Sequence, residues 1–73
     1  MRKYAQRIRA LRKEHKKSQV QIAGILGISQ TMYSRYEREE NELPVRHLIG
    51  LSQYYNVSSD YILGLSDIKM YRP

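Results

Sequence analysis

The chain has 73 residues, a formal net charge of +6 and no cysteine. At this length we expect one domain, which buries only about 60% of the surface that its unfolded chain exposes. The lack of cysteine excludes a disulfide framework and a thiolate metal site, and no run of 18 apolar residues or signal-like apolar stretch is present. We therefore expect a cytoplasmic protein that does not enter a membrane.

The charges are unevenly distributed along the chain. Eight of the thirteen basic residues lie in the first 17 positions, and four of the seven acidic residues lie between positions 37 and 42. A basic N-terminal segment attracts the phosphate backbone of nucleic acid, and its binding weakens steeply with salt as counterions are released. A helix face that only keeps the protein in solution explains any single lysine there equally well.

The first predicted helix covers residues 2–15. Its apolar stripe is formed by Tyr4, Ile8, Leu11 and His15, which are spaced by four, three and four positions. The chain contains one other histidine, His47, so no histidine pair has the spacing of metal ligands. We predict no metal site and no cofactor.

The second predicted helix begins after Ser18, whose hydroxyl can accept a bond from a free amide of the first turn, and it ends before Gly27. Glycine suits the left-handed conformation that follows a helix. The residues expected to face the core are Val20, Ile22, Ala23 and Leu26. Ile25 falls on the outer side, either lightly exposed or as part of a contact patch.

A third helix is expected from Gln30 to about Glu39, with Ser29 as its N-cap and Ile28 filling the corner between the two helices. At about 100° per residue, its polar side chains fall within an arc of about 140°. That arc comprises Gln30, Thr31, Ser34, Arg35 and Arg38. Two tyrosines, Tyr33 and Tyr36, and the acidic Glu37 take the opposite arc.

The polar arc carries the groups that read DNA. Glutamine can bond adenine through two atoms, arginine can bond guanine or phosphate, and hydroxyls can bond either. Two short helices joined by a three-residue turn present such an arc to the major groove. An ordinary solvated face is the alternative.

The second half of the chain predicts two more helices. Pro44 suits the first turn of a fourth helix, whose expected core residues are Val45, Leu48, Ile49, Ser52 and Tyr55. Asn56 and Val57 form the exit turn, and Ser58 or Ser59 caps a short fifth helix that Gly64 ends. We therefore predict an all-α domain of five helices over residues 1–65, followed by a short tail over 66–73 that either adds contacts or frays.

The sequence resembles the Xre/Cro/cI family of lambda-repressor-like helix-turn-helix regulators. The segment RIRALRKEHKKSQVQIAGILGISQTMYSRYERE resembles the first three helices of that family, and LPVRHLIGLSQYYNVSSDYILGL resembles the last two. The resemblance covers residues 7–65, about four fifths of the chain. It is specific because Gly-Ile-Ser-Gln, Ser-Arg-Tyr-Glu and Asn-Val-Ser-Ser-Asp-Tyr-Ile-Leu-Gly occur together.

The polar arc and the resemblance together assign candidate roles. The predicted base-reading residues are Gln30, Thr31, Ser34 and Arg35, and the predicted phosphate contacts are Gln19, Ser29 and Arg38. The family often pairs an arginine of its first helix with the glutamate that ends its third, and the matching residues here are Arg12 and Glu37. A bidentate guanidinium would compensate a carboxylate on the inner arc, so we expect this pair to be structural.

The chain departs from the family pattern after Arg38, because Glu39 stands where glycine is frequent and Glu40, Asn41 and Glu42 follow. We expect a solvated acidic loop that points away from the duplex, with a protein-facing patch as the alternative. The resemblance also places a self-association surface on the last helices. Its candidate residues are Tyr54, Tyr61, Ile62 and Leu65.

These observations predict sequence-specific binding to operator DNA by a transcriptional regulator, acting as a repressor that occupies a promoter. A two-fold homodimer is expected because a single helix-turn-helix reads few base pairs. An antitoxin-like protein-interaction module is the alternative, and Ile25 and the acidic loop would serve it. No nucleophile and base pair or glycine-rich phosphate loop supports an enzyme or a small-molecule substrate.

Overall fold

The computed structural model describes residues 3–70, which form five helices. The helices are α1 (Lys3–Glu14), α2 (Gln19–Leu26), α3 (Gln30–Glu37), α4 (Val45–Tyr55) and α5 (Ser59–Leu63). The predicted all-α class, with five helices in this order, is therefore confirmed. Arg2, with which we expected the first helix to begin, lies outside the described residues.

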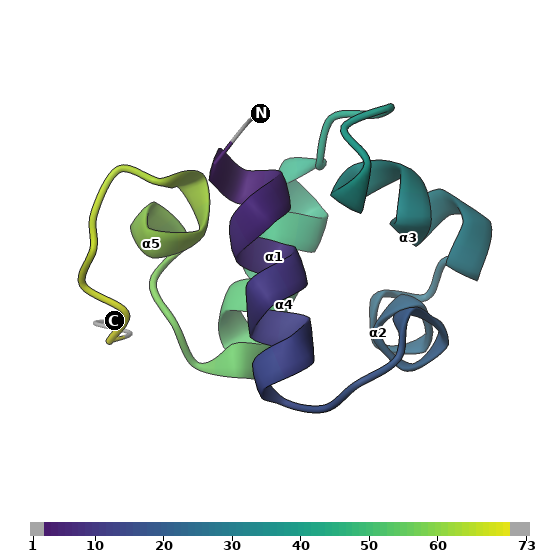
Figure 1. The fold of residues 1–73 in the computed structure, drawn as a ribbon, viewed down its shortest axis with the longest axis horizontal. Coiled ribbons are helices and arrows are strands. Elements are labelled where there is room, and N and C mark those ends of the chain that lie inside the picture. Colours follow the sequence, from purple (N-terminus) through teal and green to yellow (C-terminus); the bar gives the residue numbers. More distant parts are fainter. Residues whose placement is uncertain (1–2, 71–73) are drawn as a thin grey trace.

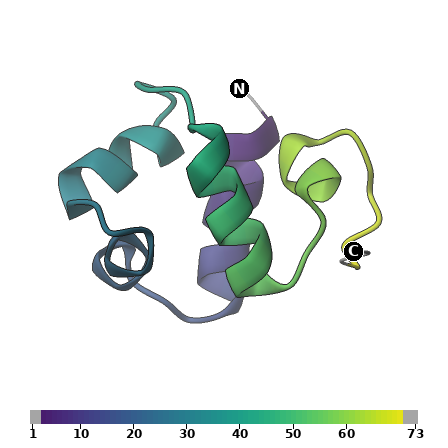
Figure 2. The ribbon, with the colours of Figure 1, turned by 180° about the vertical axis from the view of Figure 1, so that it is seen from behind.

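The helices are arranged around a central pair. In Figure 1, α1 lies in front of α4, with α2 and α3 on one side of them and α5 with the C-terminal segment on the other; Figure 2 shows the same order from behind. Both α3 and α5 contact α1, while α2 and α5 contact α4. The unit of α2 and α3 therefore stands apart from the C-terminal part of the molecule.

All five helices contribute to one hydrophobic core, which the short segment between α4 and α5 completes. Its buried members are Ile8, Leu11, Ile22, Ala23, Tyr33, Tyr36, Leu51, Tyr55, Val57 and Ile62. Tyr33 is a large, fully buried side chain of α3. Because an aromatic ring of α3 lies at the centre of this core, the orientation of α3 depends on the packing of the whole domain.

The predicted N-caps of α2, α3 and α5 and the predicted glycine that ends α2 are confirmed in atomic detail. Ser18 and Gln21 form a reciprocal capping box at the start of α2, and the hydroxyl of Ser29 accepts a bond from the amide of Met32 at the start of α3. Ser58, rather than Ser59, caps α5. Gly27 ends α2 with φ = 71°, a conformation that glycine adopts without steric cost.

Three apolar residues that we expected in the core are exposed instead. Val20 on α2 and Val45 and Ile49 on α4 are 65%, 70% and 48% exposed. In α4 the buried stripe is His47, Leu51 and Tyr55, at i, i+4 and i+8. Of the expected core residues of α4, Ser52 and Tyr55 are buried and Leu48 packs against the core, so only Val45 and Ile49 were wrongly placed. Their place is taken by His47 and Leu51, and His47 packs against the ring of Tyr36 at 6.0 Å between centroids.

The end of α3 also differs from the expectation. The helix ends at Glu37 rather than continuing to Glu39, and Glu39 itself adopts the left-handed conformation, with φ = 62°. The amides of Glu40 and Asn41 then donate to the carbonyl of Arg35. The chain thus turns at a glutamate where glycine would be less strained.

The described part of the tail is folded back on the domain. Ser58 donates its amide to the carbonyl of Lys69, and Val57 pairs with Met70 as an isolated antiparallel bridge. The guanidinium of Arg7 in α1 donates to the carbonyls of Tyr61 and Ser66 and to Asp67. Residues 66–70 therefore form a strap, which we call the C-terminal strap.

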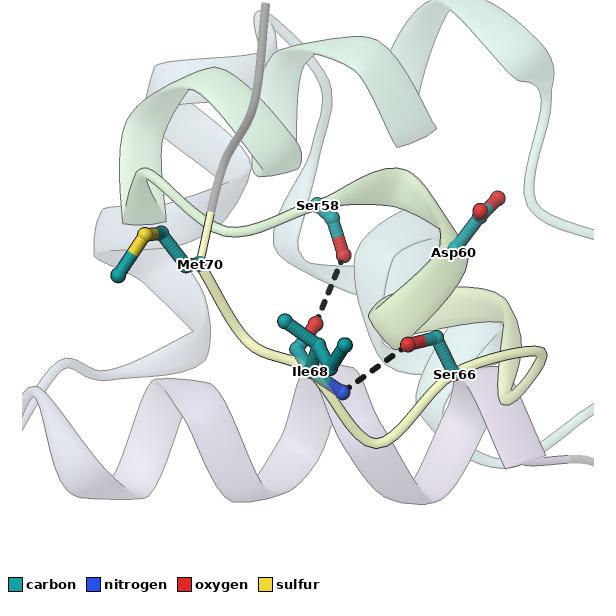
Figure 3. Close-up of a pocket in the computed structure, with 5 residues that line it drawn as sticks. All are labelled: Ser58, Asp60, Ser66, Ile68 and Met70. Atoms are coloured by element: carbon teal, nitrogen blue, oxygen red, sulfur yellow. Dashed lines mark hydrogen bonds between the residues drawn. The ribbon is translucent and has the colours of Figure 1, made fainter.

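The strap and α5 enclose a shallow pocket of about 230 Å³. Figure 3 shows its lining: Ser58, Asp60, Ser66, Ile68 and Met70. The hydroxyl of Ser58 donates to the carbonyl of Ile68 at 3.1 Å, and the amide of Ile68 donates to the hydroxyl of Ser66 at 3.0 Å. These polar groups already bond one another, so the pocket reflects how the strap is held rather than the site predicted on α3.

Candidate nucleic-acid interface

The polar arc of α3 faces outward and its aromatic arc faces inward. Gln30, Thr31, Arg35 and Arg38 are exposed, and Ser34 is half-buried. On the opposite side, Tyr33, Tyr36 and Glu37 are buried. This arrangement presents an amide, two hydroxyls and two guanidiniums along one edge of the molecule.

The corner between α2 and α3 is held by main-chain hydrogen bonds. The amide of Gly27 donates to the carbonyl of Gly24 at 3.2 Å, and the amide of Ile28 donates to the carbonyl of Ala23 at 3.0 Å. Ile28 is partly buried against the core, as its place in the sequence predicts. Backbone bonds and an apolar plug therefore fix the angle at which α3 leaves α2.

Behind α3 lies a group of bonded polar side chains, which we call the carboxylate cluster: Arg12, Gln19, Tyr33 and Glu37. Arg12 reaches both oxygens of Glu37, with Nε to Oε2 at 2.8 Å and Nη2 to Oε1 at 3.1 Å. The hydroxyl of Tyr33 donates to Oε2 at 2.5 Å, and Nε2 of Gln19 donates to Oε1 at 3.2 Å. The structure thus contains the expected bidentate pair, with two further donors.

The cluster keeps a buried carboxylate charged. The side chain of Glu37 is only 3% exposed, and burial alone would raise its pKa. The donors from Arg12, Tyr33 and Gln19 together outweigh burial, so the pKa of Glu37 is lowered. The hydrogen bond to Glu37 in turn raises the pKa of Arg12, and burial raises that of Tyr33. Both neighbours therefore remain protonated donors at neutral pH.

A second link joins the cluster to the polar arc. Nε2 of Gln30 donates to Oε1 of Gln19 at 2.7 Å, and the other end of the Gln19 amide donates to Glu37. Gln19 stands at the first position of α2 and Gln30 at the first position of α3. The structure therefore brings together one predicted phosphate contact, one predicted base reader and the predicted ion pair.

The other two predicted phosphate contacts also have partners within the chain. The hydroxyl of Ser29 accepts from Met32 and keeps its own proton to donate. Arg38 pairs with Glu40 at 3.2 Å, and both side chains are about half exposed. A phosphate would have to compete with Glu40 for Arg38. We therefore expect Arg38 to be a weaker phosphate contact than Ser29.

The four predicted self-association residues do not form one surface. Ile62 is fully buried in the core, so the expectation that it contacts a second subunit is wrong. Its apolar side chain closes the core between α5 and the helices beneath it. Tyr61 is half-buried under the guanidinium of Arg7, 4.0 Å from its ring centre, whereas Tyr54 and Leu65 are 38% and 75% exposed.

Two contacts lay beyond the reach of the sequence analysis. Gln19 was assigned to a phosphate alone, although it also bonds Glu37 and Gln30, which lie 18 and 11 positions further along the chain. Arg7 was one of several basic residues of the first helix, yet it holds the C-terminal strap. In both cases the partner is set by how helices pack, which no local spacing reveals.

Comparison with known proteins shows the family to which this chain belongs. The model of the helix-turn-helix family matches residues 8–62, and the chain belongs to that family. Among curated relatives, the HTH-type transcriptional regulator YobD of Bacillus subtilis (strain 168) is 47% identical over 64 residues, which is 88% of this chain. This chain spans 57% of the length of YobD and 60% of that of a second regulator from the same organism.

Solved structures agree with this assignment. The P22 c2 repressor in complex with synthetic operator 9T superposes with a TM-score of 0.77 at 35% identity, covering 86% of this chain and 96% of that one. The N-terminal DNA-binding domain of SinR from Bacillus subtilis gives a TM-score of 0.73 at 30% identity, covering 82% and 88%. The resemblance to lambda-repressor-like regulators is therefore confirmed.

Proposed function

We propose that this chain binds double-stranded operator DNA in a sequence-specific manner, with α3 in the major groove, and acts as a transcriptional regulator. The observation that carries the proposal is the exposed polar arc of α3, set on a buried face of two tyrosines and a paired glutamate. Gln30, Thr31, Ser34 and Arg35 are the base-reading residues of the proposal, because such side chains match the edges of bases.

The relatives support this function. YobD is named a transcriptional regulator, and the P22 c2 repressor was solved on a synthetic operator. Arg7 and Arg12 are held by bonds within the protein, but Lys3, Arg9, Lys13 and Lys16 are exposed. These exposed basic residues supply the attraction to phosphate that such binding requires. A helix-turn-helix domain is a binding module, so we assign the chain no enzymatic activity.

Three finer statements belong to the same proposal. The protein works in the cytoplasm, where its operator is. It acts as a repressor by occupying a promoter, as the repressor neighbour suggests. It binds as a homodimer, which doubles the recognised sequence and spaces the half-sites about one helical turn apart.

Selection of bound sequences from random duplexes, repeated at several salt concentrations, tests the proposal. We expect a two-fold symmetric motif and an affinity that falls linearly with the logarithm of the salt concentration. Arg35→Ala should relax the motif at one base pair, with a loss of discrimination of about 1 to 3 kcal/mol. Binding without any selected motif would contradict the proposal.

A protein-interaction module is the second candidate, because α2 exposes two apolar side chains, Val20 at 65% and Ile25 at 45%. A partner that covers α2 would protect them from water. Two results together would favour this candidate over DNA binding. The chain would co-purify with a second protein in a way that Ile25→Lys abolishes, and the duplex selection would yield no motif.

A further inference from the structure

The acidic loop, residues 39–42, is held against the end of α3 by hydrogen bonds to that helix. The amides of Glu40 and Asn41 donate to the carbonyl of Arg35 at 2.9 and 3.4 Å. The side-chain amide of Asn41 donates to the sulfur of Met32 at 3.5 Å. The conformation of the loop is therefore set by α3 itself, and the loop stays beside the polar arc.

One carboxylate of this loop occupies a predicted phosphate contact. Oε2 of Glu40 lies 3.2 Å from Nη1 of Arg38, and both side chains are about half exposed. A carboxylate and a phosphate bind a guanidinium in the same way, because both offer anionic oxygens to its paired N–H groups. Glu40 therefore takes, within the protein, the place that a DNA phosphate would take on Arg38.

Stability does not explain the acidic loop. The carboxyl end of a helix carries a partial negative charge, so acidic residues directly after it are unfavourable. Three of the four residues of the loop are glutamates, and Glu39 holds the left-handed conformation at φ = 62°, which a side chain disfavours. An exposed pair such as that of Arg38 and Glu40 stabilises a fold only weakly. Residues that break local rules in this way are expected at functional positions.

We propose that Glu40 is an internal competitor for the DNA backbone, which holds Arg38 in the free protein and must be displaced before Arg38 binds a phosphate. This inference rests on the DNA-binding function proposed above. Phosphates are the same along every duplex, so the competition lowers the affinity for all sequences alike and leaves the motif unchanged. It thereby restrains the non-specific attraction that a net charge of +6 creates.

The competition has a signature in the dependence of affinity on salt. A cation that binds a DNA phosphate releases about 0.9 of a counterion from the duplex. When Arg38 leaves Glu40 for that phosphate, the freed carboxylate attracts a cation from solution, and the two changes nearly cancel. Glu40→Gln removes this uptake but keeps the size of the side chain. The affinity of the variant should therefore fall more steeply with salt, by up to about 0.9 in the logarithmic slope.

The first measurement compares the affinities of the wild type and of Glu40→Gln for two duplexes, a selected one and one of unrelated sequence. At low salt the variant should bind both duplexes about twofold to fivefold more tightly, which is the factor expected from an exposed ion pair. Asp60→Asn is the control, because it removes the same charge from α5, on the other side of α1 and α4 (Figure 1). Its affinity and slope should stay close to those of the wild type.

A double-mutant cycle with Arg38→Gln distinguishes the competition from general repulsion between a carboxylate and DNA. If Glu40 acts by holding Arg38, then Glu40→Gln in the Arg38→Gln background should give less than half of its gain in affinity, on a logarithmic scale. A gain that keeps more than half of its size there would overturn the proposal, because Glu40 would then act on DNA without Arg38.

The pair itself can be observed without DNA. In NMR spectra, the guanidinium signals of Arg38 should shift in Glu40→Gln and stay in place in Asp60→Asn, because only the first variant removes the bonded carboxylate. Unchanged Arg38 signals in Glu40→Gln would overturn the proposal, since no contact would then exist to be displaced. The same spectra show whether each variant is folded.

The outcomes distinguish this inference from the function on which it rests. A selected motif, with neither affinity nor slope changed in Glu40→Gln, would leave the proposed function standing and show that the competition is wrong. A protein that binds no duplex in any variant would contradict both. A changed motif in Glu40→Gln would also overturn the inference, because Glu40 would then act on the bases rather than on the backbone.

Discussion

Among the ion pairs that tie α1 to distant parts of the chain, two have the same length. Arg12 meets Glu37 at 2.8 Å, and Lys69 of the C-terminal strap meets Glu14 at 2.8 Å. Their surroundings differ, because the first pair is 13% and 3% exposed and the second is 47% and 48% exposed. Water and salt screen the second pair but hardly reach the first. Contact distance is thus a poor guide to what a pair contributes.

The largest expected effect comes from breaking the buried pair. Glu37→Ala should destabilise the fold by about 3 to 5 kcal/mol, because it leaves the Arg12 charge and the Tyr33 hydroxyl without their acceptor. Urea denaturation followed by circular dichroism measures the change. Glu40→Ala, at an exposed glutamate in the next loop, is the control and should change stability by less than about 0.5 kcal/mol. An unchanged Glu37→Ala midpoint would show that the buried pair contributes no more than the exposed one.

The buried pair should also make stability depend on acid. Because the pKa of Glu37 is lowered in the fold, its contribution is complete above the pKa of the unfolded chain and is lost as the pH falls through the folded value. Burial lowers the pKa of His47, so protonating this residue also costs stability. That loss begins when the pH falls below the ordinary histidine pKa, at a higher pH than the loss that comes from Glu37. Melting temperatures of the wild type and of Glu37→Gln should therefore converge in the most acidic range. A constant difference at every pH would contradict this assignment.

A third change tests whether close backbone packing, rather than an ion pair, holds the end of α5 against α1. Gly64 ends α5 with φ = 80°, and a Cβ there would lie 2.4 Å from Cβ of Lys3 in α1. Gly64→Ala should therefore cost about 1 to 3 kcal/mol. The matched change Gly24→Ala meets open space on α2 and should stabilise the fold by up to about 1 kcal/mol. Equal thermal shifts in the two variants would show that backbone packing does not fix this region.

The smallest effect is expected from the exposed pair. Glu14→Ala should lower stability by about 0.2 to 1 kcal/mol at low salt, because a half-exposed pair gains little in water. The difference from the wild type should vanish at about 1 M salt, where the screening length falls to about 3 Å. A loss as large as that of Glu37→Ala would remove the distinction between the two pairs.

The comparison also shows which features a sequence can disclose. Ser18, Gly27 and Ser29 act on amides and carbonyls a few positions away, so their roles follow from local geometry, and the structure confirms them. Helical periodicity alone predicted that the polar arc of α3, from Gln30 to Arg38, faces outward. Such inferences need no knowledge of how the helices pack.

What the sequence did not disclose depends on rotations of whole helices. The exposure of Val45 follows from the rotation of α4, which buries His47, and the burial of Ile62 follows from how α5 meets the core. The bonds of Gln19 join α2 to both ends of α3, and the Arg7 contacts join α1 to a strap nearly 60 positions later. The Arg12–Glu37 pair is the exception, because the family resemblance pointed to it.

The place of the strap has a practical consequence for labelling. It runs on the side of α1 and α4 away from α2 and α3 (Figure 1). Two of its side chains, Ile68 and Met70, are 59% and 65% exposed. The chain has no cysteine, so a cysteine introduced at either position would be its single thiol. A fluorophore or an affinity handle coupled to that thiol would stand clear of the proposed groove contacts and would allow the protein to be immobilised with its reading edge turned toward the solution.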